Sequence, residues 1–121
     1  MTQQEKQILL KDLCARIPYR TFVQLNPGAY NKPETCILTG IHGERVHLNI
    51  DSDPFRIDNI KPYLRSTESM TEDEEKELEE TLQYTQYTLE SYDWLNEHHL
   101  DYRGLIEIGL ALEAKPEMYK I

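Results

Sequence analysis

The sequence contains few cysteines, glycines and tryptophans. Its 121 residues include 2 cysteines, 5 glycines and 1 tryptophan. Cys14 and Cys36 lack C-x-x-C spacing, and no charged-then-apolar leader opens the chain, so we expect a cytoplasmic protein with reduced thiols. No apolar run approaches the ~20 residues needed to cross a bilayer, so no membrane span is predicted.

Several sequence signatures of catalysis are also absent. No serine lies in a G-x-S-x-G context, and no glycine-rich phosphate loop follows a predicted strand. The carboxylates between Glu72 and Glu80 lack the apolar surroundings that separate the pKa values of an acid–base pair. Cys14 falls on the apolar face of the first predicted helix, where a free thiol is ordinarily inert. We therefore expect no catalytic residue, no cofactor and no enzyme activity.

What the chain has in abundance is charge, and that charge is unevenly distributed. Residues 1–65 carry nine Lys/Arg and seven Asp/Glu, whereas residues 66–121 carry four and fifteen, and the net charge is −9. Nucleic acid and anionic lipid would be repelled by the second part, because phosphate binding needs several Lys or Arg side chains. The asymmetry indicates two surfaces with different partners.

The length favours one domain with its own core. A chain of 14.3 kDa buries roughly two thirds of its unfolded surface, which suffices without a disulfide or a metal. We expect a single α+β domain over residues 1–121. Its first part, residues 1–65, should hold a helix and a β-sheet, and its second part, residues 66–121, should be acidic and helical.

The first predicted element is an amphipathic helix over residues 3–16. Leu9, Leu13 and Cys14 recur at helical spacing on one face, and Asp12 falls on the other. Pro18 should end this helix, because the residue before a proline is pushed out of the helical region.

Four short strands are predicted next, because the apolar period changes to two. They cover residues 21–25, 35–41, 45–50 and 55–60. The turn clusters between them are Asn26-Pro27-Gly28, His42-Gly43 and Asp51-Ser52-Asp53-Pro54. Pro62 should stop the last strand. The pattern predicts a small four-stranded antiparallel sheet, either a meander or a partly closed barrel.

The acidic part should begin with a capped helix. Thr71 is the predicted cap, and Glu74 completes a capping box. An apolar seam at helical spacing follows, formed by Leu78, Leu82, Thr85, Leu89 and Tyr92. Such a narrow seam is typical of a helix that docks on a neighbouring element.

Two further helices are predicted near the end of the chain. Ser91 would cap a short helix that contains Trp94, and Trp94 should pack the helical third against the sheet. Asp101 would cap another helix over residues 102–108, with Gly109 as its left-handed stop. An extended tail should follow.

A candidate metal site lies at His98, His99 and Asp101. Metal-binding histidines on a helix are spaced by three or four residues, whereas adjacent ones point about 100° apart. An H-H-x-D sequence can still chelate from a turn. A metal-dependent enzyme is therefore one alternative function, set against structural hydrogen bonds to the imidazoles.

A candidate nucleic-acid face lies in the sheet part. Its basic and aromatic residues are Arg45, Arg56, Lys61, Tyr63 and Arg65. Small barrels bind nucleic acid with such surfaces. A nucleic-acid-associated barrel is therefore the other alternative function, and a solvated surface is the competing interpretation.

The acidic helix is the more distinctive surface. Its candidate partner-binding residues are Glu72, Glu75, Glu79, Glu80, Tyr84 and Tyr87. Regularly spaced carboxylates imitate the charge of a nucleic-acid backbone and speed association with a basic groove. Tyrosines are favoured at interface centres. The leading prediction is a non-catalytic protein that occupies another protein's surface, with ordinary solubility as the competing interpretation and the oligomeric state left open.

Three stretches resemble a known group of proteins. They read LLKDLCARIPY (residues 9–19), KPYLRSTESMT (61–71) and DWLNEHHLDYRGLIEIGLALEAKPEMY (93–119). They resemble short uncharacterised proteins of gut Bacteroidota, their phages and mobile elements. The resemblance implies a small accessory protein of a mobile element. Separately, IDNIKPYL (57–64) is similar to the closing segment of SH3-like barrels, including those of some retroelement integrases, which implies an SH3-like fold but no function.

Overall fold

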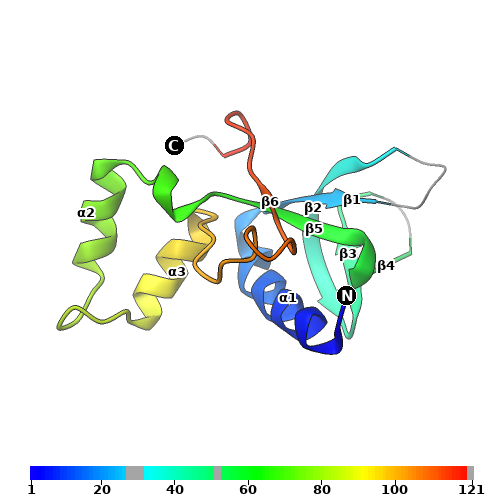
Figure 1. Cartoon of the computed structure of the whole chain (residues 1–121), viewed down its shortest axis with the longest axis horizontal. Helices are drawn as coiled ribbons and strands as arrows, with labels where there is room; N and C mark the ends of the chain where they lie inside the picture. The colour runs from blue at the N-terminus through cyan, green and yellow to red at the C-terminus, as the bar shows by residue number, and fades with distance from the viewer. Residues whose placement is uncertain (27–31, 51–52, 120–121) are drawn as a thin grey trace.

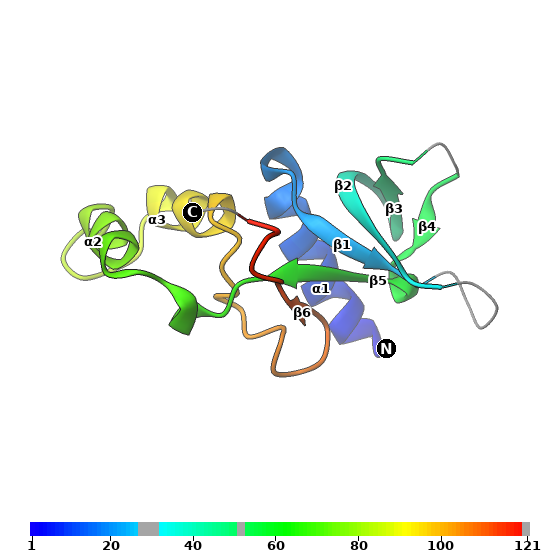
Figure 2. The same cartoon turned by 90° about the horizontal axis from the view of Figure 1, so that it is seen from above.

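The protein has an α+β fold, as predicted. The computed structural model describes residues 1–26, 32–50 and 53–119. Its helices are α1 (Gln3–Arg16), α2 (Glu72–Glu80) and α3 (Leu89–Glu97), and its strands are β1 (Phe22–Leu25), β2 (Glu34–His42), β3 (Arg45–Leu48), β4 (Phe55–Arg56), β5 (Ile60–Leu64) and β6 (Leu112–Glu113). Figures 1 and 2 show the sheet at one end of the molecule, α2 and α3 at the other, and α1 between them.

The first helix has the predicted bounds. Thr2 caps it, and Glu5 returns a hydrogen bond to the Thr2 backbone, which completes a capping box. The predicted faces are wrong at two positions: Asp12 is fully buried, whereas Cys14 is exposed. Arg16, one turn further on, neutralises the Asp12 carboxylate and is buried with it. Periodicity alone places such a charged pair on the solvent side.

The sheet is larger and more open than predicted. Among the described residues it has six strands in the order β4-β3-β2-β1-β5-β6. The first five pair antiparallel, and β6 joins β5 in parallel. The sheet is therefore mixed, and it does not close into a barrel. The predicted His42-Gly43 turn is confirmed, since Gly43 has φ +61° between β2 and β3.

The fourth predicted strand is divided in two. After β4, a 3-10 turn over Ile57–Asn59 redirects the chain into β5, which continues through Pro62 to Leu64. The Asn26 N–H donates to Asn59 O, so Asn26 and Asn59 form a hydrogen-bonded pair. In an antiparallel pair of strands only every second residue faces its partner with its backbone polar groups. Lys61 therefore faces β1, and the Pro62 nitrogen faces away from it. It lies before the first residue that pairs with β6, so the missing N–H costs no ladder bond.

The main core lies between α1 and the sheet. From the first half of the chain it contains Leu9, Leu13, Val23, Leu25, Cys36, Leu38, Val46, Leu48, Ile57, Ile60 and Leu64. From the last part of the chain it contains Leu105, Leu110 and Ala111. The predicted boundary at residue 65 therefore does not divide the core, because the C-terminal segment completes it.

A second, smaller apolar cluster lies between α2 and α3. Leu78, Leu95 and Leu100 form its buried centre, and Trp94 packs at its side. Trp94 is only partly buried and stacks on His98, with ring centroids 4.0 Å apart. The predicted packing of Trp94 against the sheet is thus wrong, because the tryptophan stabilises the helical pair instead.

Residues 102–109 form turns instead of the predicted helix. Asp101 nevertheless behaves as a cap, because its carboxylate accepts hydrogen bonds from the Leu105 and Ile106 N–H groups. Gly109 is left-handed with φ +82°, as predicted, and the Leu110 N–H donates to Leu105 O. The segment is a single turn with both ends capped, so the capping signals were genuine although no helix lies between them.

Three remaining predictions concern turns, thiols and the membrane. Pro27 and Gly28 of the predicted Asn26-Pro27-Gly28 turn, and the Asp51-Ser52 half of the next turn, lie outside the described residues. The sulfur atoms of Cys14 and Cys36 are both free, as predicted. No helix in the described ranges is long and apolar enough to span a bilayer.

Candidate functional site

The acidic helix α2 presents most of its carboxylates to solvent. Thr71 and Glu74 form the predicted capping box. Glu72, Glu75, Glu79 and Glu80 are all exposed. None of these four side chains makes a hydrogen bond or an ion pair with the residues that the structure describes. The structure therefore brings the predicted carboxylates together on one free surface.

The predicted apolar seam does not run along one helix. After α2 ends, the backbones of Gln83 and Gln86 exchange two hydrogen bonds of 3.0 Å, which close a tight hairpin. Thr88 then caps α3, and Ser91 is the third residue of that capping box instead of the predicted cap. Leu89 is 85% exposed as a result. Thr81 and Thr88 hydroxyls complete the turn by bonding to Leu78 O and Thr81 O.

Tyr84 stands at the tip of this hairpin. It is 90% exposed, and both Tyr84 and Thr85 have left-handed backbones, with φ of +53° and +66°. A two-residue turn with both residues left-handed is the type I′ turn, for which Asn-Gly is preferred because other side chains are strained there. The protein thus holds a large aromatic side chain in solvent at a position that favours a small residue.

Tyrosines extend from the hairpin toward the middle of the molecule. Tyr87 contacts Tyr92 edge-on at 5.6 Å between ring centroids, and Tyr92 contacts Tyr102 at 5.5 Å. Tyr87 and Tyr92 are each more than two-fifths exposed. Together with Tyr84 and Leu89 they are the exposed aromatic and apolar residues of the segment between the end of α2 and the start of α3, and we call these residues the hairpin patch.

One buried ion pair fixes α2 to the rest of the protein. Arg65 follows β5, and its guanidinium binds both carboxylate oxygens of Glu74 at 2.7 and 2.9 Å. Arg65 also donates to Ser69 O and His98 O. The hydrogen bonds from Arg65 lower the pKa of the Glu74 carboxyl group. The bidentate geometry orients the helix as well as holding it.

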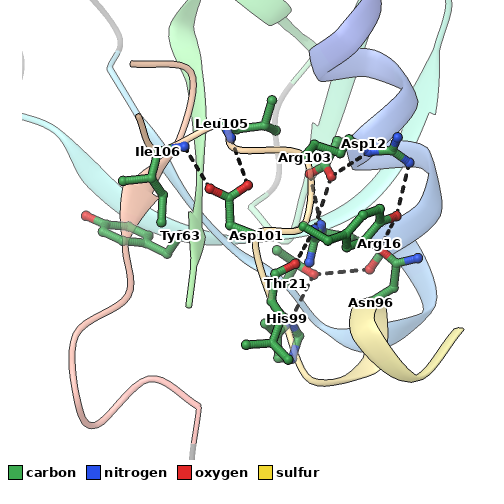
Figure 3. A network of polar contacts seen from close by, with 12 residues as sticks. Asp12, Arg16, Thr21, Tyr63, Asn96, His99, Asp101, Arg103, Leu105 and Ile106 are labelled. Atoms are coloured by element: carbon green, nitrogen blue, oxygen red, sulfur yellow. Dashed lines mark hydrogen bonds and ion pairs between the residues drawn. The ribbon is translucent and has the colours of Figure 1, made fainter. Parts of the chain in front are cut away.

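A buried polar network connects α1 to the segment after α3 (Figure 3). Asp12 accepts hydrogen bonds from Arg16 at 2.9 Å and from Arg103 at 3.0 Å. Arg16 donates to Leu100 O at 2.7 Å, and Arg103 donates to the Tyr102 hydroxyl. Both guanidinium groups also lie over the Tyr102 ring. The Asp12 carboxylate, the Tyr102 side chain and the Leu100 carbonyl thus together bind the two guanidinium groups.

His99 lies where α1, β1 and the C-terminal segment meet. Its backbone is left-handed with φ +59°, and its ring stacks on Tyr119 at 3.7 Å. Burial, and then the nearby charges of Arg16, His98 and Arg65, lower its pKa to about 4. The imidazole is therefore neutral at physiological pH.

The three candidate metal ligands point to different partners. The Nδ1 atom of His98 lies 2.9 Å from Trp94 O, and that of His99 lies 3.3 Å from the Thr21 hydroxyl. Asp101 is occupied by backbone N–H groups, as described above. Within the described ranges, no three His, Cys, Asp or Glu side chains are grouped to hold a metal ion. A metal-dependent enzyme gains no support from this geometry.

The candidate nucleic-acid residues do not share one exposed face. Tyr63 is 5% exposed, and Arg65 is 8% exposed and paired with Glu74. Arg56 is exposed but lies 3.6 Å from the Asp58 carboxylate. Arg45 and Lys61 are exposed on different strands. Three of the five residues, Tyr63, Arg65 and Arg56, are therefore buried or paired with a carboxylate in ways that compete with any nucleic-acid role.

The residues that sequence reasoning missed are those of the buried network. Asp12 and Arg16 are spaced by four on α1, which is a visible pairing signal, but the same spacing is common on solvated helix faces. Arg103 and Tyr119 carry no local signal, because their partners lie 91 and 97 residues away in the sequence. Only the tertiary structure brings these groups together.

Comparisons with known proteins leave the protein without a family assignment. No family model matches the chain, and searches of curated proteins and of solved structures returned no match.

Proposed function

We propose that the protein is a non-catalytic accessory protein that binds another protein through α2 and the hairpin patch. The partner would present a basic groove beside an apolar depression. The carboxylates of α2 would lie in the groove, and Tyr84 would enter the depression. The protein would then act by occupying a surface that the partner uses for other contacts.

One observation supports this proposal above the others. Tyr84 and Leu89 are 90% and 85% exposed in the segment that follows α2, and four carboxylates of α2 have no partner among the described residues. Scattered apolar residues on a surface need no explanation, but an aromatic and apolar group at a strained turn within an acidic surface does. Aromatic side chains typically carry most of the binding energy at interface centres.

The charge of α2 would act mainly on the rate of association. Acidic residues steer a basic partner from a distance, and salt screens this attraction over about 10 Å at ordinary ionic strength. Contacts of the Tyr84 ring would be less sensitive to salt, because they depend on burial of apolar surface. Complexes formed by this surface should therefore weaken with rising salt without disappearing.

A matched pair of variants tests the proposal. In the first variant, Glu72, Glu75, Glu79 and Glu80 become Gln. In the control, the same charge change is made at Glu34, Glu68, Glu107 and Glu117, which are also exposed and have no side-chain partner among the described residues. Wild-type and both variants would be immobilised and used to capture proteins from a bacterial lysate over a series of salt concentrations.

We expect the α2 variant to lose some of the captured proteins, and the control variant to lose none. Wild-type and control should retain the same proteins, whereas the α2 variant should lose those that salt also elutes. Replacing Tyr84 by Ala should weaken the same complexes about tenfold or more, which is typical of an interface centre. Retention of one common set of proteins by all the immobilised forms would exclude α2 as the binding surface.

Two finer features belong to the same proposal. A role in a phage or mobile element is supported by the three stretches quoted from residues 9–19, 61–71 and 93–119. An SH3-like origin of the sheet is supported by the strand order β4-β3-β2-β1-β5 and by the 3-10 turn at Ile57–Asn59, directly before β5. Neither feature identifies the partner.

A further inference from the structure

A pocket of about 410 Å³ lies between the end of α3, the start of β1 and the C-terminal segment. Its walls come from five parts of the chain: the end of the 3-10 turn that follows α1, the start of β1, Arg65 after β5, the end of α3, and the C-terminal segment. Tyr19, Arg20, Phe22, Glu97, His99 and Tyr119 are among the lining residues. The pocket thus combines aromatic walls with two guanidinium groups, one carboxylate and two imidazoles.

The hydrogen bonds of His99 determine what its ring offers to this pocket. The Thr21 hydroxyl donates its proton to Arg16 O, so its oxygen is left to accept from the Nδ1–H of His99. The other nitrogen, Nε2, then carries a lone pair. Nε2 makes no hydrogen bond to the described residues. Among these residues, the one fully buried side-chain nitrogen or oxygen without a partner is Arg16 Nη1. Because Nε2 is unpaired but is not that atom, it is not fully buried. Nε2 is therefore accessible, as an acceptor.

Of the three charged residues at the pocket, Arg65 is paired with Glu74, whereas Arg20 and Glu97 are opposite in charge and free to bind. Arg20 is exposed, and its guanidinium makes no hydrogen bond or ion pair with any described side chain or backbone group. Glu97 is exposed as well and has no such partner either. An anionic group of a ligand would suit Arg20, and a group with N–H bonds would suit Glu97 and Nε2 of His99.

The backbone at the pocket is strained in two places. Arg20 and His99 both have left-handed backbones, with φ of +52° and +59°. The other non-glycine residues with positive φ in the described ranges are Tyr84 and Thr85, at the hairpin tip. Strained residues cluster where a fixed side-chain position is functional. Two of the four lie at one pocket.

We propose that this pocket binds a small zwitterion of the amino-acid class, either a free amino acid or a short peptide. Its carboxylate would pair with Arg20, and its ammonium group would donate to Glu97 and to Nε2 of His99. An apolar or aromatic side chain would lie against Tyr19 and Phe22. This site is separate from α2 and the hairpin patch, so it does not depend on the proposed function.

A set of related ligands tests which groups are recognised. ¹⁵N-labelled protein would be titrated with phenylalanine, N-acetylphenylalanine and phenylalaninamide while the imidazole and backbone signals of His99 are followed. Phenylalanine should shift these signals, whereas each blocked ligand should bind at least about tenfold more weakly, because it lacks one charge-assisted contact. Glycylphenylalanine, in which the two charges are further apart, would distinguish a free amino acid from a peptide as the preferred ligand.

A variant pair gives the matching protein control. Arg20→Gln should weaken phenylalanine binding about tenfold or more, and Arg45→Gln, the same change at an exposed arginine of β3, should leave it unchanged. The proposal is overturned if His99 carries its proton on Nε2, if phenylalanine causes no shift, or if the blocked ligands or Arg20→Gln bind equally well.

Discussion

Tyr119 is the side chain on which several parts of the structure depend. Its hydroxyl accepts a hydrogen bond from the Phe22 N–H at 2.7 Å and donates one to Tyr63 O at 2.8 Å. It thereby bridges β1 and β5 next to their last paired residues, Val23 and Pro62. Burial raises the pKa of this phenol, so the proton that Tyr63 O needs stays in place.

Removal of the Tyr119 hydroxyl should therefore destabilise the protein. Tyr119→Phe keeps the ring stack on His99 but leaves the Phe22 N–H and the Tyr63 carbonyl without a partner. We expect a loss of about 1–3 kcal/mol in the free energy of unfolding, measured with urea. Tyr84→Phe, at an exposed hydroxyl, should have no effect. Equal stability of the two variants would show that Tyr119 does not bridge the strands.

The neutral state of His99 predicts a pH dependence. Its pKa is about 4 in the folded protein, below the ordinary value of 6.5, because of burial and the charges of Arg16, His98 and Arg65. Between these pH values the unfolded chain binds a proton that the folded protein does not. The contribution of His99 is therefore complete above about pH 6.5 and falls by on the order of 3 kcal/mol as the pH drops to 4.

The measurement is urea unfolding over this pH range, compared with His99→Asn. Asparagine tolerates a left-handed backbone and does not titrate, so the variant should have a flatter profile whatever its absolute stability. The stabilising effect of the lowered Glu74 pKa is lost below about pH 4.5, at the acidic end of this range, and both proteins retain it. Identical slopes between pH 6.5 and 5 would contradict a buried, neutral His99.

Single residues were predictable from the sequence where their partners are local. The Thr71 and Glu74 capping box and the left-handed Gly109 depend on neighbours within a few positions, and both are confirmed. Asp12 was placed on the wrong face because its burial depends on Arg103, a distant residue. A local pattern reports backbone conformation well, but it cannot report which charge a fold will neutralise.

At the scale of an element, the hairpin between α2 and α3 is the most strained. Left-handed backbone costs roughly 1–2 kcal/mol for a residue with a side chain, and Tyr84 and Thr85 both adopt it. The hydrogen bonds between Gln83 and Gln86 close the turn without removing that cost. Tyr84 is too exposed for contacts within the protein to compensate.

Replacing the two residues at the tip of the hairpin should stabilise the protein. The double substitution Tyr84→Asn with Thr85→Gly installs the preferred type I′ pair and should raise the free energy of unfolding by about 1–2 kcal/mol. Thermal unfolding should show a melting temperature several degrees higher. Tyr84→Ala with Thr85→Ala keeps the strain and serves as control. If the Asn-Gly protein is no more stable than the Ala-Ala protein, the turn is not left-handed.

Elements were predicted well where one strong signal fixes both ends. The capped helix α1 and the strands β1 to β3 fall close to their predicted bounds. The strand that was expected to stop at Pro62 continues, because its nitrogen faces away from β1, which only the pairing register reveals. The short β6 has no sequence signal, since it comprises two residues and pairs with a strand far away in the chain.

At the scale of the whole molecule, two apolar clusters divide the structure unequally. The larger cluster joins α1, the sheet and the C-terminal segment, whereas the smaller one joins α2 and α3. One buried residue of α2, Leu78, belongs to the smaller cluster, and Glu74 supplies the ion pair to Arg65. The helical pair should therefore open more readily than the sheet.

Hydrogen exchange should reveal this difference. Amides of α2 should exchange faster than those of β1 and β2, and Glu74→Gln should accelerate exchange in α2 further. The substitution leaves the buried Arg65 guanidinium without an anion, which costs about 3–5 kcal/mol for a buried pair. Glu75→Gln, at an exposed neighbour, should change nothing. Equal acceleration in β1 and α2 would mean that the protein opens as a single unit.

The C-terminal segment has a consequence for how the protein is made. Leu105, Leu110, Ala111 and the hydroxyl of Tyr119 all contribute to the part of the molecule built mainly from residues before 65. On a ribosome, which releases the N-terminal residues first, the early helix and sheet would therefore wait with an open apolar face until almost the whole described chain has emerged. During that interval the apolar face that Leu105, Leu110 and Ala111 later cover would be exposed to solvent.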